Sequence, residues 1–275
     1  MRFEDEPAYV LEARPYRETS LLLELLTASH GRLAMVARGV RGGSRGAVAR
    51  RAALEPFRRL RVAASGRGDV LTLGAIESEG RVLRLAGAPL FSAWYVNELL
   101  HRLTGRGDPA PLLFRRYVAW LDELADIVAV SPGTLWVGEQ RPAAFGSDPP
   151  ARPDADDAAG DEGTDSRLAW SLRRFERDLI GLLGYALALD EDCLSGLPLR
   201  DDVAYCLDPE HGARPWSADS PWPRASADVL RAWAGQTQPP AQQLRQLKPL
   251  ARALLRHYLG GGELRAWRLA AQWRI

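Results

Sequence analysis

The sequence predicts an α+β protein in which a small five-stranded barrel precedes a helical bundle. Two observations carry this prediction. Short apolar runs of strand length, separated by glycine-containing turns, fill the first 85 residues. Apolar residues at helical spacing fill most of the chain after Pro89. Hydrophobic residues make up 46% and charged residues 26% of the 275 residues, which is ordinary usage for a globular protein.

The predicted strands cover residues 9–11, 21–26, 33–37, 57–63 and 70–76. Turn residues separate them, among them His30-Gly31 and the glycine-rich segment 39–46, which we expect to be a flexible loop. Five short strands without a crossover helix favour a small antiparallel barrel. The OB-fold is the economical choice among such barrels, and its open face commonly binds oligonucleotides. We therefore predict an OB-fold nucleic-acid-binding domain over residues 1–85.

The predicted helices cover residues 91–104, 111–127, 166–184, 241–259 and 263–272, with Ser166 as a cap. Residues 138–166 contain almost no large apolar side chain, so we expect a disordered insertion there. The division that follows is a helical domain over 86–189 with that insertion, an irregular lobe over 190–224 with at most a hairpin near residues 203–206, and carboxyl-terminal helices over 225–275 that pack on the helical domain.

Charge is unevenly distributed, although the formal net charge is only +1. Residues 32–67 hold ten arginines and one acid, a balance of +9, whereas residues 138–166 have a balance of −6. Several cations on one face neutralise phosphates and release counterions, which is the physical basis of nucleic-acid binding. The alternative for the basic segment is a loop that only aids solubility. The predicted DNA-binding residues are Arg14, Arg17, Arg32, Arg38, Arg41, Arg45, Arg50 and Arg51.

Several classes of chemistry lack their motifs in this chain. No phosphate-binding GxxxxGK[ST] loop, GxSxG elbow or HExxH pair occurs, so the sequence does not predict an enzyme. Glu98 and His101 match one Glu-x-x-His unit, but carboxylate-bridged metal sites need two such units and further glutamates. Cys193 and Cys206 lack CxxC spacing, so we expect no metal site and no cofactor. The apolar runs are too short to span a bilayer, and the acidic start resembles no signal peptide, so we expect a cytoplasmic, nucleoid-associated protein.

Five motifs, in order along the chain, resemble the RecO family of bacterial DNA repair proteins. They lie at residues 8–20, at 25–39 followed by Leu54-Glu55-Pro56-Phe57, at 95–100, at 172–185 and at 256–260. The resemblance is broken mainly at 138–166 and 190–224. It implies an amino-terminal OB-fold, a helical domain and a small lobe that holds a four-cysteine zinc site in many members. This chain lacks those cysteines, and it has Arg265-Ala266-Trp267 where the family often has Lys-Ser-Arg.

The resemblance also implies a function, that of a recombination mediator. Such a protein binds single- and double-stranded DNA, anneals complementary strands, binds the carboxyl-terminal tail of the single-stranded DNA-binding protein, and acts with RecR to load the RecA recombinase. An alternative is an adaptor that binds the tail but has little DNA affinity of its own. The acidic, aromatic-ended tail needs an apolar pocket with cations at its rim. The predicted receptor residues are Phe114, Tyr117, Leu172, Arg173, Arg174, Phe175 and Arg177.

Overall fold

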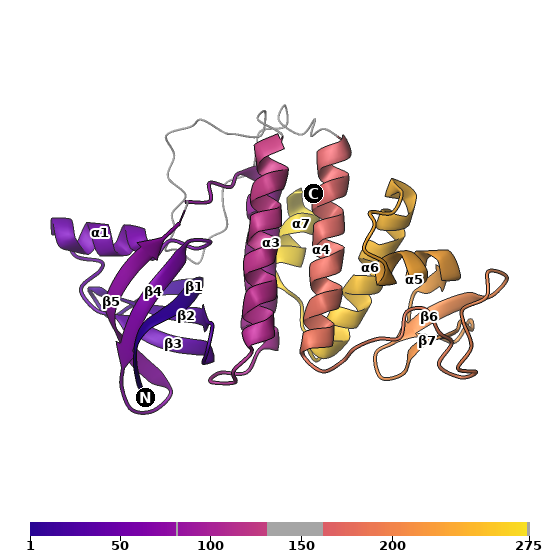
Figure 1. The fold of residues 1–275 in the computed structure, drawn as a ribbon, viewed down its shortest axis with the longest axis horizontal. Helices are drawn as coiled ribbons and strands as arrows, with labels where there is room; N and C mark the ends of the chain where they lie inside the picture. Colours follow the sequence, from indigo (N-terminus) through magenta and orange to yellow (C-terminus); the bar gives the residue numbers. More distant parts are fainter. Residues whose placement is uncertain (81, 131–161, 274–275) are drawn as a thin grey trace. The chain divides into compact units, whose positions relative to one another are not determined.

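The computed structural model describes all residues except Arg81, 131–161 and 274–275 (Figure 1). The described residues divide into two compact units, one made of residues 1–121 and 264–273, the other of 122–130 and 162–263. The predicted disordered insertion falls mostly on residues outside the described ranges. Its last residues, 162–166, are described and belong to a helix.

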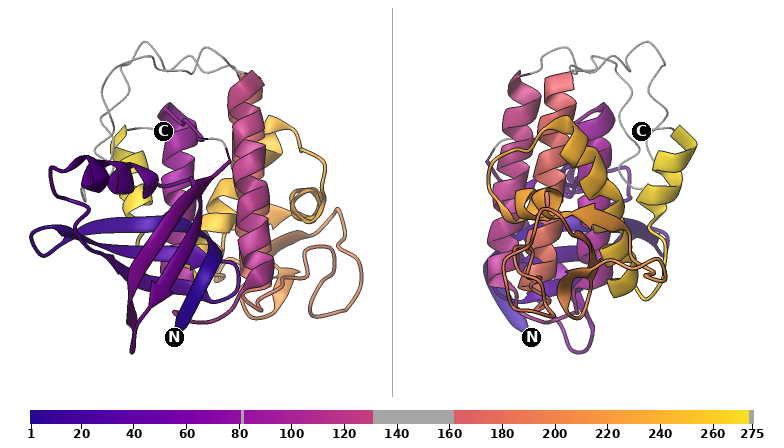
Figure 2. Two further views of the ribbon diagram at one scale, coloured as in Figure 1. Left: turned by 60° about the vertical axis from the view of Figure 1, so that its left-hand side comes forward. Right: turned by 90° about the vertical axis from the view of Figure 1, so that its right-hand side faces the viewer.

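The first unit is built on a five-stranded barrel, as the sequence predicts, and Figure 2 draws the ribbon from two further sides. The barrel is closed, with strand order β1-β2-β3-β5-β4. All neighbouring pairs are antiparallel except β3 and β5, whose parallel pairing completes the barrel. This arrangement is the OB-fold. The strands are β1 (Arg2–Tyr16), β2 (Ser20–Thr27), β3 (Gly31–Ala37), β4 (Arg59–Ser65) and β5 (Val70–Glu79).

Strand β1 is much longer than the predicted run because it pairs with two partners. Its first half pairs with β4 and its second half with β2. Register shifts after Phe3 and after Val10 interrupt the two ladders, and Asp5 has a φ of 59° at the first of them. Bulges bend a strand and increase its twist, which lets β1 curve around the barrel. Leu21, Leu23 and Leu25 of β2 alternate into the core that this closure creates.

The glycine-rich segment after β3 is irregular up to Ser44, and a helix that the sequence analysis did not predict begins at Arg45. Helix α1 (Arg45–Ala53) follows Ser44, whose hydroxyl accepts a hydrogen bond of 3.2 Å from the Ala47 amide. The serine cap satisfies one of the amides that a helix leaves unpaired at its start. The sequence signal for helix α1 was obscured because glycines surround Ser44 and because α1 has few apolar residues, of which Ala47 is buried.

Helices α2 (Gly87–Leu103), α3 (Pro111–Val130) and α7 (Arg265–Trp273) agree with the prediction to within a few residues at most ends. In the first unit, α2 packs on β1 and on α7. The boundary between the two units falls within α3, after Leu121. The four-part domain division stays a prediction.

The second unit contains α4 (Glu162–Leu182), α5 (Ala227–Ala234) and α6 (Ala241–Tyr258). Helix α4 begins before Ser166, so that serine is not its cap. Helix α5 was not predicted, because its eight residues are too few to show a helical period clearly. Trp233, fully buried in α5, packs this short helix into the unit.

The small lobe is more regular than the sequence predicts. The hairpin near residues 203–206 exists as β6 (Ala204–Asp208) and β7 (Gly212–Pro215), and β8 (Arg224–Ser226) adds a third strand to β6. Tyr205 is buried in this sheet, and its hydroxyl accepts a hydrogen bond of 3.0 Å from the Arg200 amide.

Candidate nucleic-acid interface

Most of the predicted DNA-binding arginines lie on the surface of the barrel. The exposed members of the set are Arg14, Arg17, Arg38, Arg41, Arg45 and Arg50, whereas Arg51 is half-buried and Arg32 is buried. Arg14 lies on β1 opposite Leu22 of β2. The set therefore contains six surface cations, one half-buried residue and one interior residue.

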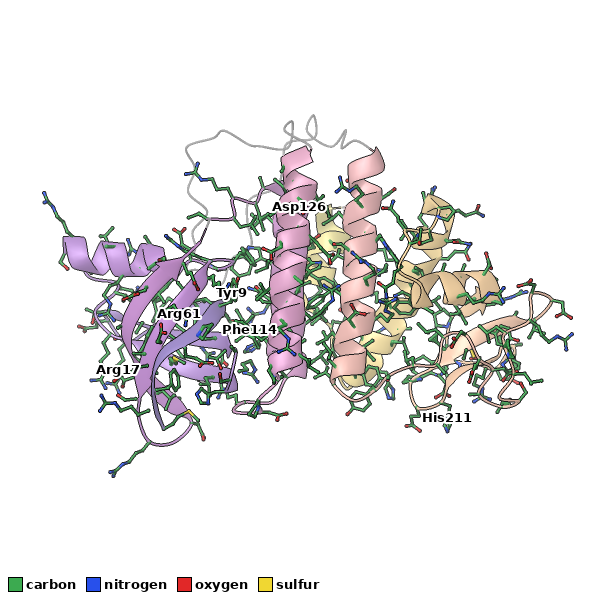
Figure 3. The ribbon with its side chains drawn as sticks, in the orientation of Figure 1. Tyr9, Arg17, Arg61, Phe114, Asp126 and His211 are labelled. Carbon is green, nitrogen blue, oxygen red and sulfur yellow. The ribbon has the colours of Figure 1, made fainter. Side chains whose placement is uncertain are left out.

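Arg17, Arg38 and Arg41 lie together at one edge of the barrel. Arg17, in the tight turn between β1 and β2, has a φ of 54° and is labelled in Figure 3. The Arg41 amide donates a hydrogen bond of 2.9 Å to the Thr19 carbonyl, and its guanidinium donates one of 3.1 Å to the Arg17 carbonyl. These two bonds hold the segment after β3 against the β1–β2 turn. Two basic segments that are distant in sequence thus form one surface.

A groove of about 700 Å³ opens at this edge. Arg17 and Arg38 supply its cations, Glu18 is its one acid, and the Arg17 guanidinium lies 5.2 Å from the ring centre of Tyr16. Cations beside an aromatic ring suit a single strand, because phosphates pair with the cations and a base stacks on the ring. The groove residues are Tyr16, Arg17, Glu18, Thr19, Ser20, Val36, Arg38, Val70, Leu71 and Thr72.

Helix α1 carries a second group of cations and contains no acid. Arg45, Arg50 and Arg51 all belong to it. The Arg50 guanidinium donates a hydrogen bond of 3.1 Å to the Gly74 carbonyl of β5, which ties the helix to the barrel. These three arginines are therefore presented by a helix that follows the glycine-rich loop.

Arg32 does not belong with the exposed cations. Its guanidinium donates to Glu24 at 2.6 Å and to the Thr104 carbonyl at 2.9 Å, and Arg106 pairs with the same glutamate. Glu24 is 2% exposed, so these contacts keep a buried carboxylate paired. Arg32 therefore holds the segment after α2 against β3, and a role for it in DNA binding stays a prediction that these internal contacts do not favour. Arg106 was missed because it lies 82 residues from Glu24 and no spacing links them.

Part of the +9 balance is cancelled in space by acids from other segments. Arg59 lies 3.0 Å from Glu79 of β5, and Arg61 lies 3.6 Å from the same carboxylate and 3.0 Å from Asp5. The uncompensated positive charge is therefore at the turn, the groove and α1, and not along β4.

The predicted tail-binding aromatic residues on α3 lie in the first unit. Phe114 and Tyr117 are buried, with ring centres 5.9 Å and 5.3 Å from that of Tyr9 on β1 (Tyr9 and Phe114 are labelled in Figure 3). The Tyr117 hydroxyl donates a hydrogen bond of 2.6 Å to Asn97 of α2. Both side chains therefore join helices to the barrel.

The remaining tail-binding candidates lie on α4, in the second unit. Phe175 is fully buried, and Leu172 is half-buried. Arg173 pairs with Glu176 at 2.7 Å, and Arg174 pairs with Glu123 at 2.8 Å. Arg177 donates to the carbonyls of Trp233, Ala234 and Gly235 at the end of α5, at 2.6 to 3.0 Å. These guanidinium groups have internal partners, and tail binding by this set stays a prediction.

The Glu98–His101 pair of α2 has a structural explanation. The Glu98 carboxylate accepts hydrogen bonds of 2.7 Å from the Arg265 amide and 2.9 Å from the Ala266 amide, so it caps α7. His101 lies 3.6 Å from Glu12, and burial lowers the pKa of its imidazole, an effect that Glu12 opposes.

The lobe does not offer the ligands of a structural zinc site. Cys206 is buried in β6 and its sulfur accepts a hydrogen bond of 3.3 Å from the Ser220 hydroxyl, while Cys193 lies outside the strands. In the described ranges, no three His, Cys, Asp or Glu side chains come together in a way that could hold a metal ion. The residues present do not fit the four-cysteine zinc site that the resemblance implies for many members.

No helix in the described part of the chain is both long and apolar enough to cross a membrane.

The fold and this surface define an OB-fold protein whose barrel presents arginines around a groove. Comparison with known proteins then identifies the family. Residues 1–79 match the family model of the Recombination protein O N terminal. The chain is 36% identical to the DNA repair protein RecO of Cupriavidus metallidurans, over 96% of this chain and 76% of that protein. It is 34% identical to RecO of Stenotrophomonas maltophilia strain K279a, over 99% and 98%, and 36% identical to RecO of Laribacter hongkongensis, over 94% and 90%.

The chain therefore belongs to the RecO family, and its role lies in DNA repair and recombination.

Proposed function

We propose that this chain is a recombination mediator that binds DNA through its barrel and anneals complementary single strands. The groove beside Tyr16, with Arg17 and Arg38 at its wall and Arg41 tied to the same turn, is the observation that carries the proposal. Single strands bind where cations follow the phosphates and aromatic rings receive bases. Double-stranded DNA offers the same phosphates to the arginines of α1.

Annealing follows from this surface without an energy source. Two complementary strands repel through their phosphates, and arginines that neutralise those charges lower the repulsion while the base edges stay free to pair. The proposal also includes a role with RecR in loading the RecA recombinase, and this part rests on family membership. We place the protein in the cytoplasm at the nucleoid, and the proposal gives it no catalytic group.

Binding of the tail of the single-stranded DNA-binding protein is a further part of the proposal. Phe175 and its neighbours on α4 are interior residues in this structure. A tail bound there would have to displace the contacts that Arg173 and Arg177 make with Glu176 and with the end of α5.

The decisive experiment is fluorescence-monitored annealing of complementary oligonucleotides without ATP. We expect the protein to accelerate annealing, and the variant R17A/R38A/R41A to do so less. The adaptor alternative predicts tail-peptide binding with neither DNA binding nor annealing. A protein that binds the peptide but shows no salt-dependent affinity for DNA would contradict the proposal.

A further inference from the structure

Helix α6 of the second unit carries cations and no acid. Among its 18 residues are Arg245, Lys248, Arg252 and Arg256, and neither Asp nor Glu occurs. The spacings of three, four and four residues place these side chains along one face of a helix, because an α-helix turns every 3.6 residues. All four are exposed.

The opposite face of α6 explains why this row of four cations, the α6 stripe, points outward. Leu247, Leu250 and Leu254 are buried, and the helix packs against α4 and α5. The orientation of α6 is therefore fixed by its apolar face. From Arg245 to Arg256 the stripe extends about 16 Å at 1.5 Å per residue.

Acids of neighbouring elements lie near both ends of α6. Glu263 lies 3.5 Å from Arg256, at one end of the stripe. Asp228 of α5 accepts a hydrogen bond of 2.8 Å from Gln243. In the part of the chain that the structure describes, Arg245 and Lys248 form no ion pair. By contrast, α4 carries acids among its arginines, and Arg173, Arg174 and Arg177 pair with them or with neighbouring acids.

We propose that three residues of the α6 stripe, Arg245, Lys248 and Arg252, bind the phosphate backbone of a second strand of DNA. The inference rests on the proposed function, since it assumes that the barrel binds the first strand. With a surface on each unit, one molecule holds two strands at once, which gives annealing its second substrate. A linear row of cations suits phosphates, which recur at about 3.4 Å per nucleotide along each strand of a helix.

An acidic peptide is the competing occupant, and the surroundings of the stripe disfavour it. The exposed residues beside the cations are Gln242, Gln246 and Pro249. None of the large apolar side chains exposed in the described residues lies on α6. A peptide that ends in an aromatic residue needs an apolar pocket, whereas a phosphate backbone needs only cations and polar neighbours.

The test compares the stripe variant R245A/K248A/R252A with a control that removes the same number of exposed cations elsewhere, R102A/R115A/R268A. For a single-stranded oligonucleotide, we expect the slope of log affinity against log salt to fall in magnitude by about two for the stripe variant. At low salt we expect the wild type to bind two oligonucleotides per chain and the stripe variant one. The annealing rate of the stripe variant should fall along with its DNA affinity, and the control should have the affinity, stoichiometry and annealing rate of the wild type.

Circular dichroism and thermal unfolding check that the stripe variant folds, and the double variant R245A/K248A, which keeps Arg252, replaces it if it does not. A slope, stoichiometry and annealing rate equal to those of the control overturn the proposal. Loss of tail-peptide binding with DNA binding retained also overturns it, in favour of the peptide. Absence of any DNA binding by the wild type would instead contradict the proposed function itself.

Discussion

The Tyr117 hydroxyl of α3 donates a hydrogen bond of 2.6 Å to the side-chain oxygen of Asn97 on α2. The Asn97 amide in turn donates to the carbonyls of Val10 and Leu11 on β1, at 3.3 Å and 3.1 Å. Asn97 is 1% exposed and Tyr117 is fully buried. One asparagine therefore joins a strand and two helices of the first unit.

Replacing Asn97 by Leu should lower the free energy of unfolding by about 2 to 3 kcal/mol. The change leaves the Tyr117 hydroxyl and two backbone carbonyls without their partner, and an unpaired buried polar group costs about 1 to 3 kcal/mol. Urea unfolding measures the change. Tyr117→Phe removes only one hydrogen bond, so it should cost less than Asn97→Leu. Equal stability of Asn97→Leu and wild type would show that this network contributes nothing.

The same tyrosine predicts how stability depends on alkaline pH. Burial raises the pKa of Tyr117 well above its ordinary value of 10, because the ionised phenolate would lose its solvation. A group with a raised folded pKa contributes stability that is complete below its unfolded pKa and is lost as the pH rises above it. We therefore expect the protein to lose stability above about pH 10, and Tyr117→Phe to lose less over the same interval.

Tyr258 needs a separate variant in that experiment. Burial, with Tyr185 and nearby acids, raises its pKa to about 12, and its hydroxyl donates a hydrogen bond of 2.7 Å to the Pro209 carbonyl. Tyr258→Phe should therefore also flatten the alkaline loss. If Tyr117→Phe follows the wild-type profile while Tyr258→Phe does not, Tyr117 is not the group that titrates.

The barrel could be predicted from the sequence because its signal is local. Short apolar runs in β2 and β3 and turn residues such as Gly31 specify strands directly. Gly31 was recognisable as a turn residue, but its closeness to the Asp108 carbonyl, which a side chain would overlap, depends on a segment far along the chain.

The candidate site was predictable only in part, because some of its contacts join residues that are distant in sequence. Exposed arginines such as Arg17 and Arg38 follow from the basic composition of their segments. The burial of Arg32 and the pairing of Arg61 with Asp5 and Glu79 depend on partners distant in sequence. Charge counted along a chain does not show which cations meet acids after folding.

Arg177 contributes to the stability of the second unit, and this contribution can be measured separately from any role in tail binding. Three carbonyls at the end of α5 accept hydrogen bonds from its guanidinium. Charge-assisted hydrogen bonds contribute about 1.5 to 3 kcal/mol, so Arg177→Ala should lower the free energy of unfolding by an amount in this range. Thermal unfolding measures it.

Tail-peptide binding by R173A/R177A must therefore be measured on protein shown to be folded. Fluorescence anisotropy reports the affinity, with DNA binding as the control. Loss of peptide affinity in a folded variant that still binds DNA would support the α4 receptor, and unchanged affinity would remove Arg173 and Arg177 from it. Phe175→Ala is unsuitable here, because truncating a fully buried aromatic residue destabilises the unit.

Glu98→Ala should loosen α7 without unfolding the barrel. The carboxylate accepts the first amides of α7 at 2.7 Å and 2.9 Å, and losing such a cap costs about 0.5 to 2 kcal/mol. Hydrogen exchange of the α7 amides should become faster, while exchange in β2 and β3 stays unchanged. Glu98→Gln keeps a hydrogen-bond acceptor, so its α7 exchange rates should lie between those of the wild type and those of Glu98→Ala. Uniform acceleration across the barrel would contradict a local role.

The last prediction tests whether the groove or α1 makes the main DNA contact. The variants R17A/R38A/R41A and R45A/R50A/R51A each remove three cations from the barrel surface. If all three cations of a set contact phosphates of a single strand, the slope of log affinity against log salt should fall in magnitude by about two in the variant that lacks them.

We expect the larger loss for the groove variant, because Arg17 lies over Tyr16 and Arg41 fixes the turn that carries Arg17. Arg50 already donates to the Gly74 carbonyl, so α1 has one cation fewer to offer. Both variants are compared with R102A/R115A/R268A over a salt titration monitored by anisotropy. Slopes equal to that of the control in both variants would exclude this face of the barrel as the main contact. A loss confined to the α1 variant would move the contact from the groove to the helix.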